Sequence, residues 1–293
     1  MKKTVFTDAG VAIVTPFNKD LSVNYGKLEE LIEYQITNST DAIIICGTTG
    51  EASTLTDEEH RDVIRFAVEK TAGRIPVIAG TGSNDTAYAI ELTRFAKEAG
   101  ADAYLNVTPY YNKTTQLGLV RHFSAIADAV DLPCILYNVP GRTGMTIKPE
   151  TYKELSKHPN IVATKEASGN VADIVHIRSL CGDALDIYSG EDGLITPILS
   201  LGGKGVISVL SNIVPKDTHD ICAEYFNGNV SRSAELQIKY SNLIDALFIE
   251  TNPIPVKAAL NILGFDVGEC RLPLCEMSPS NLETLKKALN IVK

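Results

Sequence analysis

The segment IVATKEASGN at residues 161–170 holds a strand, a turn and the start of a helix within ten residues. Residues 161–163 form an apolar run typical of a buried strand, and residues 168–170 are turn formers that open a helical pattern. Lys165 follows the apolar run, where a charged ammonium group is poorly solvated. The segment therefore predicts one strand–helix unit with a lysine at the C-terminal end of its strand.

The same unit recurs along the chain. Short apolar runs, each followed by a polar turn and a helical pattern, lie at residues 11–17, 42–46, 76–80, 103–107, 134–139, 161–165, 186–190 and 205–210. Near-continuous apolar strands that alternate with helices are typical of a parallel sheet buried on both faces. Eight such units close a (β/α)₈ barrel of the TIM type, whereas a doubly wound open sheet would have fewer strands or a nucleotide-binding motif. We predict the α/β barrel over residues 1–225.

The chain is longer than a barrel requires. Helical patterns continue after the eighth strand, at residues 215–227, 230–248, 253–263 and 279–292. Only one helix is needed to complete the eighth unit. We therefore expect residues 226–293 to form a C-terminal helical domain.

Composition and charge exclude several classes of protein. The 293 residues include 27 Lys plus Arg against 36 Asp plus Glu, a net charge of −9 that argues against nucleic acid or anionic membranes as partners. We find no signal peptide and no apolar run of ~18 residues, so we expect a cytoplasmic protein. The six cysteines form no CxxC pair and the five histidines have no metal-ligand spacing, which predicts reduced, mostly buried thiols and no metal.

Lys165 is the only basic side chain within a predicted strand. If it points into the barrel, Ala163 and Ile161 share its face by the period-two rule. Burial disfavours the ammonium form, so part of the side chain is a neutral amine that can attack a carbonyl carbon and form a Schiff base. The alternative is a structural ion pair with Glu166 or Glu51.

Polar residues gather at the predicted C-terminal ends of the neighbouring strands, where barrels of this type hold their active sites. Tyr137 ends the strand before Lys165 and could exchange protons with the amine, or is a rim tyrosine with a solvated hydroxyl. The loop CGTTGE at residues 46–51 offers hydroxyl and N–H groups to a carboxylate, or is an ordinary turn that caps a helix. Arg142 in the loop NVPGRTG could clamp a second carboxylate, or lie in solvent.

These motifs resemble a known family. The segments GTTGE, TPYYN, LYNVPGRTG, TKEASG and GVISV are similar to those of the dihydrodipicolinate synthase family, within the pyruvate-dependent class I aldolases related to N-acetylneuraminate lyase. The resemblance runs from about residue 5 into the C-terminal helices. It implies condensation of pyruvate with L-aspartate 4-semialdehyde in lysine and diaminopimelate biosynthesis, with no cofactor and no metal. It also implies a homotetramer built as a dimer of dimers.

The resemblance also implies catalytic roles. Lys165 forms the Schiff base with pyruvate, and Tyr137 and Thr48 relay protons. Tyr111 completes the relay and, in the family, comes from the neighbouring subunit.

Further residues are expected to bind substrates or a regulator. Thr48 and Thr49 hold the pyruvate carboxylate, Arg142 binds the carboxylate of the semialdehyde, and Gly190 and Ile207 line the pocket. A feedback site for lysine is implied at Asn84, His60 and Tyr110.

One departure from the family pattern concerns that feedback site. Lysine-inhibited members carry a histidine and a glutamate where this chain has Asp57 and Tyr88. The glutamate would bind the ammonium of lysine, so we expect weak or absent inhibition.

The rival functions are another Schiff-base pyruvate lyase, acting on sialic acid or a keto-deoxy sugar acid, and a barrel that binds a keto acid without turnover.

Overall fold

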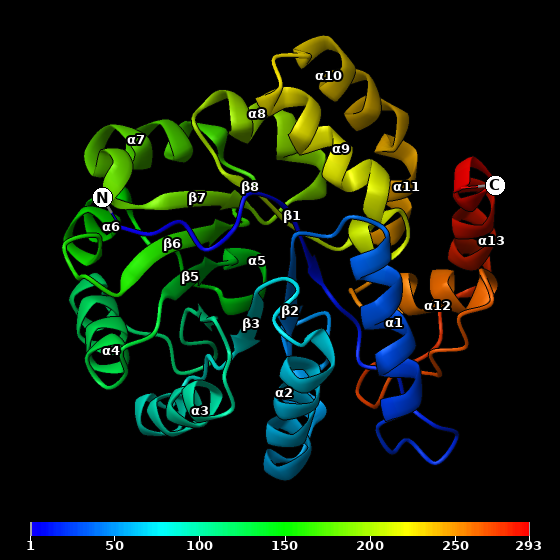
Figure 1. Cartoon of the computed structure of the whole chain (residues 1–293), viewed down its shortest axis with the longest axis horizontal. Helices are drawn as coiled ribbons and strands as arrows, with labels where there is room; N and C mark the ends of the chain where they lie inside the picture. Colours follow the sequence, from blue (N-terminus) through cyan, green and yellow to red (C-terminus); the bar gives the residue numbers. More distant parts are fainter. Residues whose placement is uncertain (1, 293) are drawn as a thin grey trace.

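The computed structural model describes residues 2–292 and contains a closed barrel of eight parallel strands in sequence order (Figure 1). The strands are β1 Asp8–Ala12, β2 Ala42–Ile45, β3 Val77–Gly80, β4 Ala103–Val107, β5 Cys134–Asn138, β6 Ile161–Glu166, β7 Asp186–Ser189 and β8 Gly205–Ser208. β8 pairs with β1 and closes the ring. The predicted (β/α)₈ barrel is confirmed.

A helix follows every strand and covers the outside of the barrel (Figure 1). These helices are α1 Tyr25–Thr37, α2 Asp57–Thr71, α3 Thr86–Glu98, α4 Gln116–Asp128, α6 Pro149–Leu155, α7 Val171–Cys181, α8 Ile195–Ser200 and α9 Pro215–Phe226. A further short helix, α5 Pro140–Thr143, lies in the loop after β5. No helix among residues 2–292 is long and apolar enough to cross a membrane.

The C-terminal helices that we expected are present. They are α10 Val230–Lys239, α11 Ser241–Leu247, α12 Ile254–Ile262 and α13 Pro279–Ala288. The predicted helix over 230–248 is divided at Tyr240 into α10 and α11. In Figure 1, α12 and α13 lie beyond α1, on the side of the molecule opposite the N-terminus. Leu247, Val256 and Leu260 share a hydrophobic cluster with Leu31 of α1, so these helices have no separate core; the boundary at residue 225 stays a prediction.

The first strand differs from its prediction. β1 ends at Ala12 instead of extending through the apolar run at 11–17. The N–H of Val14 donates to Asn212 Oδ1 at 3.2 Å, and the N–H of Phe17 donates to the carbonyl of Val267 at 3.0 Å. The second half of this apolar run is buried beneath the C-terminal helices and the loop before them, which a strand pattern cannot distinguish from burial in a barrel.

Apolar and aromatic side chains fill part of the barrel interior. Phe6, just before β1, stacks on Tyr188 of β7 with ring centroids 4.3 Å apart, and both belong to the cluster inside the barrel. Ala163 belongs to the same cluster, but Ile161 packs in the outer cluster with the helices. The register shifts here, because Cys134 pairs with Ile161 while Ile135 pairs with Ala163. This irregularity breaks the period-two rule, and the expectation that Ile161 shares a face with Lys165 was wrong.

Candidate active site

Lys165 and Tyr137 are direct neighbours across β5 and β6. The ammonium nitrogen of Lys165 lies 4.5 Å from the centre of the Tyr137 ring, and both side chains are buried. A Cβ atom at Gly190 would come within 3.1 Å of Lys165 Cε. Glycine at position 190 therefore leaves the room that the lysine stem occupies, which places three of the predicted site residues together.

Neither carboxylate that we considered as a partner for Lys165 binds it. Glu166, the next residue on the strand, accepts hydrogen bonds from Asn138 Nδ2 at 2.9 Å and Tyr152 Oη at 2.8 Å. Glu51 pairs with Lys257 at 2.8 Å. Among residues 2–292, no carboxylate lies within ion-pair distance of the Lys165 ammonium. The ion-pair alternative is therefore wrong.

The surroundings of Lys165 and Tyr137 shift the pKa values of both side chains. Burial lowers the pKa of Lys165 from 10.5 to about 8, although the charge of Asp192 opposes the shift. Burial raises the pKa of Tyr137 to about 12, and the charge of Arg142 and a hydrogen bond with Thr48 act against it. Near neutral pH the amine is therefore partly neutral, while the phenol keeps its proton and can donate it.

A cavity of about 440 Å³ opens beside Tyr137. Its lining includes Thr48, Tyr137 and Arg142, together with His60 and Tyr110 from the expected regulatory site. Arg142 is exposed on α5. Ile207 is buried on β8 in the cluster that contains Tyr137, but its side chain does not line the cavity.

Two predicted residues, Tyr111 and Asn84, do not line this cavity. Tyr111 is 92% exposed and has a left-handed backbone, with φ of 67°. Asn84 lines a separate cavity with Asn112, whose side chain donates to its carbonyl at 2.9 Å. Neither Tyr111 nor Asn84 is therefore among the residues that line the cavity with Tyr137 and His60.

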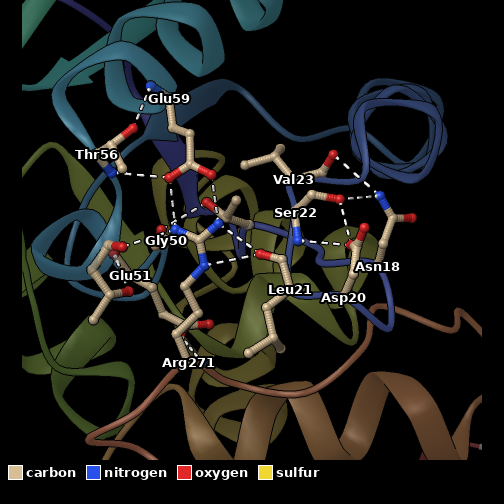
Figure 2. A network of polar contacts seen from close by, with 12 residues as sticks. Asn18, Asp20, Leu21, Ser22, Val23, Gly50, Glu51, Thr56, Glu59 and Arg271 are labelled. Atoms are coloured by element: carbon tan, nitrogen blue, oxygen red, sulfur yellow. Dashed lines mark hydrogen bonds and ion pairs between the residues drawn. The ribbon is translucent and has the colours of Figure 1, made fainter.

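The loop that carries Thr48 and Thr49 is strained and firmly held. Cys46 and Glu51, which flank it, both have φ of 54°, a left-handed conformation that costs a non-glycine residue about 1 kcal/mol or more. The Glu51 carboxylate accepts from the N–H of Arg271 at 2.9 Å as well as from Lys257. Figure 2 shows Arg271 between Glu59 and the carbonyl of Leu21. Through the bonds to Glu51, the C-terminal segment supports the loop.

Two residues near the site had no signal that we recognised in the sequence. Asn252, between α11 and α12, donates from Nδ2 to the hydroxyl of Thr49 at 2.9 Å, and its carbonyl accepts from Arg142 at 3.0 Å. Asp192, two residues after Gly190, accepts from the N–H groups of Val209 and Leu210. Asp192 directly follows the polar segment SGE at residues 189–191, and this position could have indicated its role. Asn252 reaches the site only through tertiary packing.

Among the described residues, no group of three or more His, Cys, Asp or Glu side chains is arranged to hold a metal ion. All six cysteines are free, and Cys46, Cys134, Cys181 and Cys222 are buried, as expected.

Comparison with known proteins gives this geometry a context. The family model described as the dihydrodipicolinate synthetase family matches residues 5–292. The chain belongs to this family.

Relatives in the dihydrodipicolinate synthetase family agree over almost the full length. The 4-hydroxy-tetrahydrodipicolinate synthase of Acetivibrio thermocellus is 57% identical over 99% of this chain and 98% of its own. The crystal structure of the dihydrodipicolinate synthase from Acinetobacter baumannii, complexed with pyruvate, is 46% identical with a TM-score of 0.96 and covers 99% of each chain. The enzyme from Cyanidioschyzon merolae with lysine bound is 43% identical, also with a TM-score of 0.96 over 99% of each chain. The activity of this family member is that of a 4-hydroxy-tetrahydrodipicolinate synthase, a lyase of lysine and diaminopimelate biosynthesis.

Proposed function

We propose that Lys165 is the Schiff-base residue of this synthase and that its substrates are pyruvate and L-aspartate 4-semialdehyde. The observation that carries the proposal is a buried amine with no carboxylate partner among residues 2–292, beside a phenol that keeps its proton. A buried lysine with a lowered pKa is the nucleophile that imine formation requires.

The first half-reaction joins pyruvate to the enzyme. The neutral amine of Lys165 attacks C2 of pyruvate, and the carbonyl oxygen takes a proton to give a carbinolamine. Tyr137 donates the proton with which the hydroxyl leaves as water, and an iminium ion results. Loss of a proton from the methyl carbon then gives an enamine, with the iminium nitrogen as electron sink. We assign to Thr48, whose side chain acts on the pKa of Tyr137, the transfer of protons to and from the phenol.

The second half-reaction closes the ring. The enamine carbon adds to the aldehyde of aspartate semialdehyde, whose oxygen takes a proton and becomes the 4-hydroxyl group. The amine of this substrate attacks C2 and displaces Lys165, which leaves as a free amine while the six-membered ring forms.

Recognition of both substrates depends on their carboxylates. In a chain with a net charge of −9, an anion must be held by local donors. Thr48 and Thr49 hold the pyruvate carboxylate beside Lys165, and Arg142 binds the semialdehyde carboxylate at the cavity mouth. Gly190 leaves room for the Lys165 side chain, and Ile207 faces the substrate through its backbone carbonyl. A sugar acid would gain little from a guanidinium at this position, which favours the semialdehyde over the sialic acid and keto-deoxy sugar alternatives.

Tyr111 connects the mechanism to assembly. Its exposed side chain, which does not line the cavity of its own chain, supports a role in the site of a neighbouring subunit, within a homotetramer. Sedimentation velocity tests the assembly: a tetramer supports it, and an active monomer would contradict it. The buried free thiols favour a reducing compartment such as the cytoplasm, which cell fractionation tests.

A crystal soaked in pyruvate tests the chemical proposal. We expect continuous electron density between Lys165 Nζ and C2 of pyruvate, with the carboxylate within hydrogen-bonding distance of Thr48 or Thr49. Pyruvate bound without a covalent link, or linked elsewhere, would overturn the assignment of Lys165.

A further inference from the structure

Asn252 lies in the loop between α11 and α12, yet it touches two residues that we assign to substrate binding. Its side-chain amide donates to Thr49 Oγ1 at 2.9 Å, and its backbone carbonyl accepts from the Arg142 guanidinium at 3.0 Å. Asn252 is 5% exposed and Thr49 is 3% exposed, so water does not compete for the bond between their side chains. The C-terminal helical segment thus joins two groups that the barrel supplies from β2 and β5.

The direction of the bond to Thr49 has a chemical consequence. A threonine hydroxyl has one proton and two acceptor positions. Because the amide of Asn252 occupies an acceptor position, the hydroxyl proton stays available to another acceptor. Among residues 2–292, no other hydrogen bond involves Thr49 Oγ1. The preceding residue, Thr48, lines the cavity.

We propose that Asn252 is a positioning residue for recognition of the 2-oxo acid: it orients the Thr49 hydroxyl as a donor toward the carboxylate of pyruvate. This inference rests on the proposed function, in which Thr49 holds that carboxylate. Arg142 depends on the backbone carbonyl of residue 252 and not on its side chain. Substitutions of the side chain therefore act on one substrate and spare the other.

The substitutions Asn252→Asp and Asn252→Ala test the inference in steady-state assays that vary each substrate separately. Aspartate cannot donate, so Thr49 turns its proton toward residue 252, and the new charge repels pyruvate. We expect N252D to raise the KM for pyruvate about 10-fold or more, and N252A a few-fold, since each variant weakens the hydrogen bond from Thr49 to the charged carboxylate. The KM for aspartate semialdehyde should change less than about 2-fold in both variants.

A double-mutant cycle with Thr49→Val separates positioning from general damage. If Asn252 acts through Thr49, N252A adds little to the effect of T49V on the pyruvate KM. Asn261→Ala is the matched control, because Asn261 of α12 also bonds backbone groups, at Gly268 and Val267, but touches no site residue. The control should lower thermal stability without moving either KM.

The outcomes are distinct. A normal pyruvate KM in folded N252D, or additive effects in the cycle, would overturn the role of Asn252 while leaving the Schiff base at Lys165 intact. Equal losses for both substrates would mean that Asn252 is only structural, which also overturns the proposal. Absence of a pyruvate adduct at Lys165 in the unaltered enzyme would overturn the proposed function, and this inference with it.

Discussion

Two buried lysines in this molecule have opposite surroundings. Lys165 is 6% exposed and Lys257 is 2% exposed, and each ammonium lies over an aromatic ring, Tyr137 at 4.5 Å and Phe17 at 4.2 Å. Lys257 donates to the Glu51 carboxylate at 2.8 Å and to the carbonyl of Glu269 at 2.7 Å. Lys165 has no such carboxylate among the residues described.

The comparison separates burial from reactivity. Burial lowers the pKa of both amines, but at Lys257 the charge and hydrogen bond of Glu51 oppose the shift and keep the ion pair intact. A paired ammonium has no free electron pair to offer a carbonyl carbon. Lys257 therefore serves the fold by holding Glu51 beside the Thr48–Thr49 loop, and Lys165 is left for chemistry.

The largest effect is expected from Lys165→Met. This substitution should lower kcat at least ~10³-fold, as loss of a nucleophile does in other covalent enzymes. It should also stabilise the fold by up to ~3 kcal/mol at neutral pH, because holding an ammonium with a pKa of about 8 costs the folded state about 1.4 kcal/mol per unit below 10.5. Steady-state kinetics and urea unfolding measure both quantities. A strongly destabilised K165M would mean that Lys165 is structural.

Lys257→Met should give the opposite result. It leaves the buried Glu51 carboxylate without its cation, which costs about 3–5 kcal/mol of unfolding free energy. Pyruvate should still form an adduct at Lys165 in the folded fraction. The double variant K257M/E51Q should recover part of the stability, because it removes the unpaired charge. Urea unfolding of the single and double variants checks this, and equal stabilities would contradict the assignment of the ion pair.

The pH dependence of imine formation is a finer test. Only the neutral amine reacts, and its fraction rises with pH up to the pKa, which burial lowers to about 8. The rate of pyruvate-dependent trapping with cyanoborohydride should rise about tenfold per unit below pH 8 and level off above it. A rate that still rises tenfold per unit between pH 9 and 10 would mean that Lys165 titrates like an exposed lysine.

Free lysine should have the smallest effect. Its ammonium would need an available carboxylate, as Lys257 has in Glu51, but the Asp57 carboxylate is already bound by Arg61 and Tyr88, each at 2.8 Å. We expect the steady-state rate to be unchanged at lysine concentrations that saturate an inhibited relative, which serves as the control. Strong inhibition would show that Asp57 exchanges its partners for the ligand.

The sequence predicts the barrel well because each strand carries its own signal. Apolar runs followed by polar turns identify all eight strands. The pairing of Tyr137 with Lys165 follows from their places at the ends of consecutive strands. The errors arise where a residue is apolar for a reason other than burial inside the barrel. Val14 and Phe17 are apolar because the C-terminal segment covers them, and Ile161 faces outward because the register shifts beside it.

Residues that act only through tertiary contacts could not be predicted from the sequence. Asn252 is more than 200 positions from Thr49 along the chain, and nothing in its neighbourhood indicates a polar site. The partner of Glu51 was equally hidden, because Lys257 lies in an ordinary helical pattern. Local patterns identify which side chains can react, and only the fold shows which of them remain unpaired.

Borohydride reduction in the presence of pyruvate, followed by peptide mass spectrometry, tests the contrast between the two lysines most directly. We predict one reduced pyruvate adduct per chain, on the peptide that contains Lys165, with the Lys257 peptide unmodified. An unmodified Lys165, or an adduct at Lys257, would contradict the claim that the buried amine without a carboxylate partner is the nucleophile.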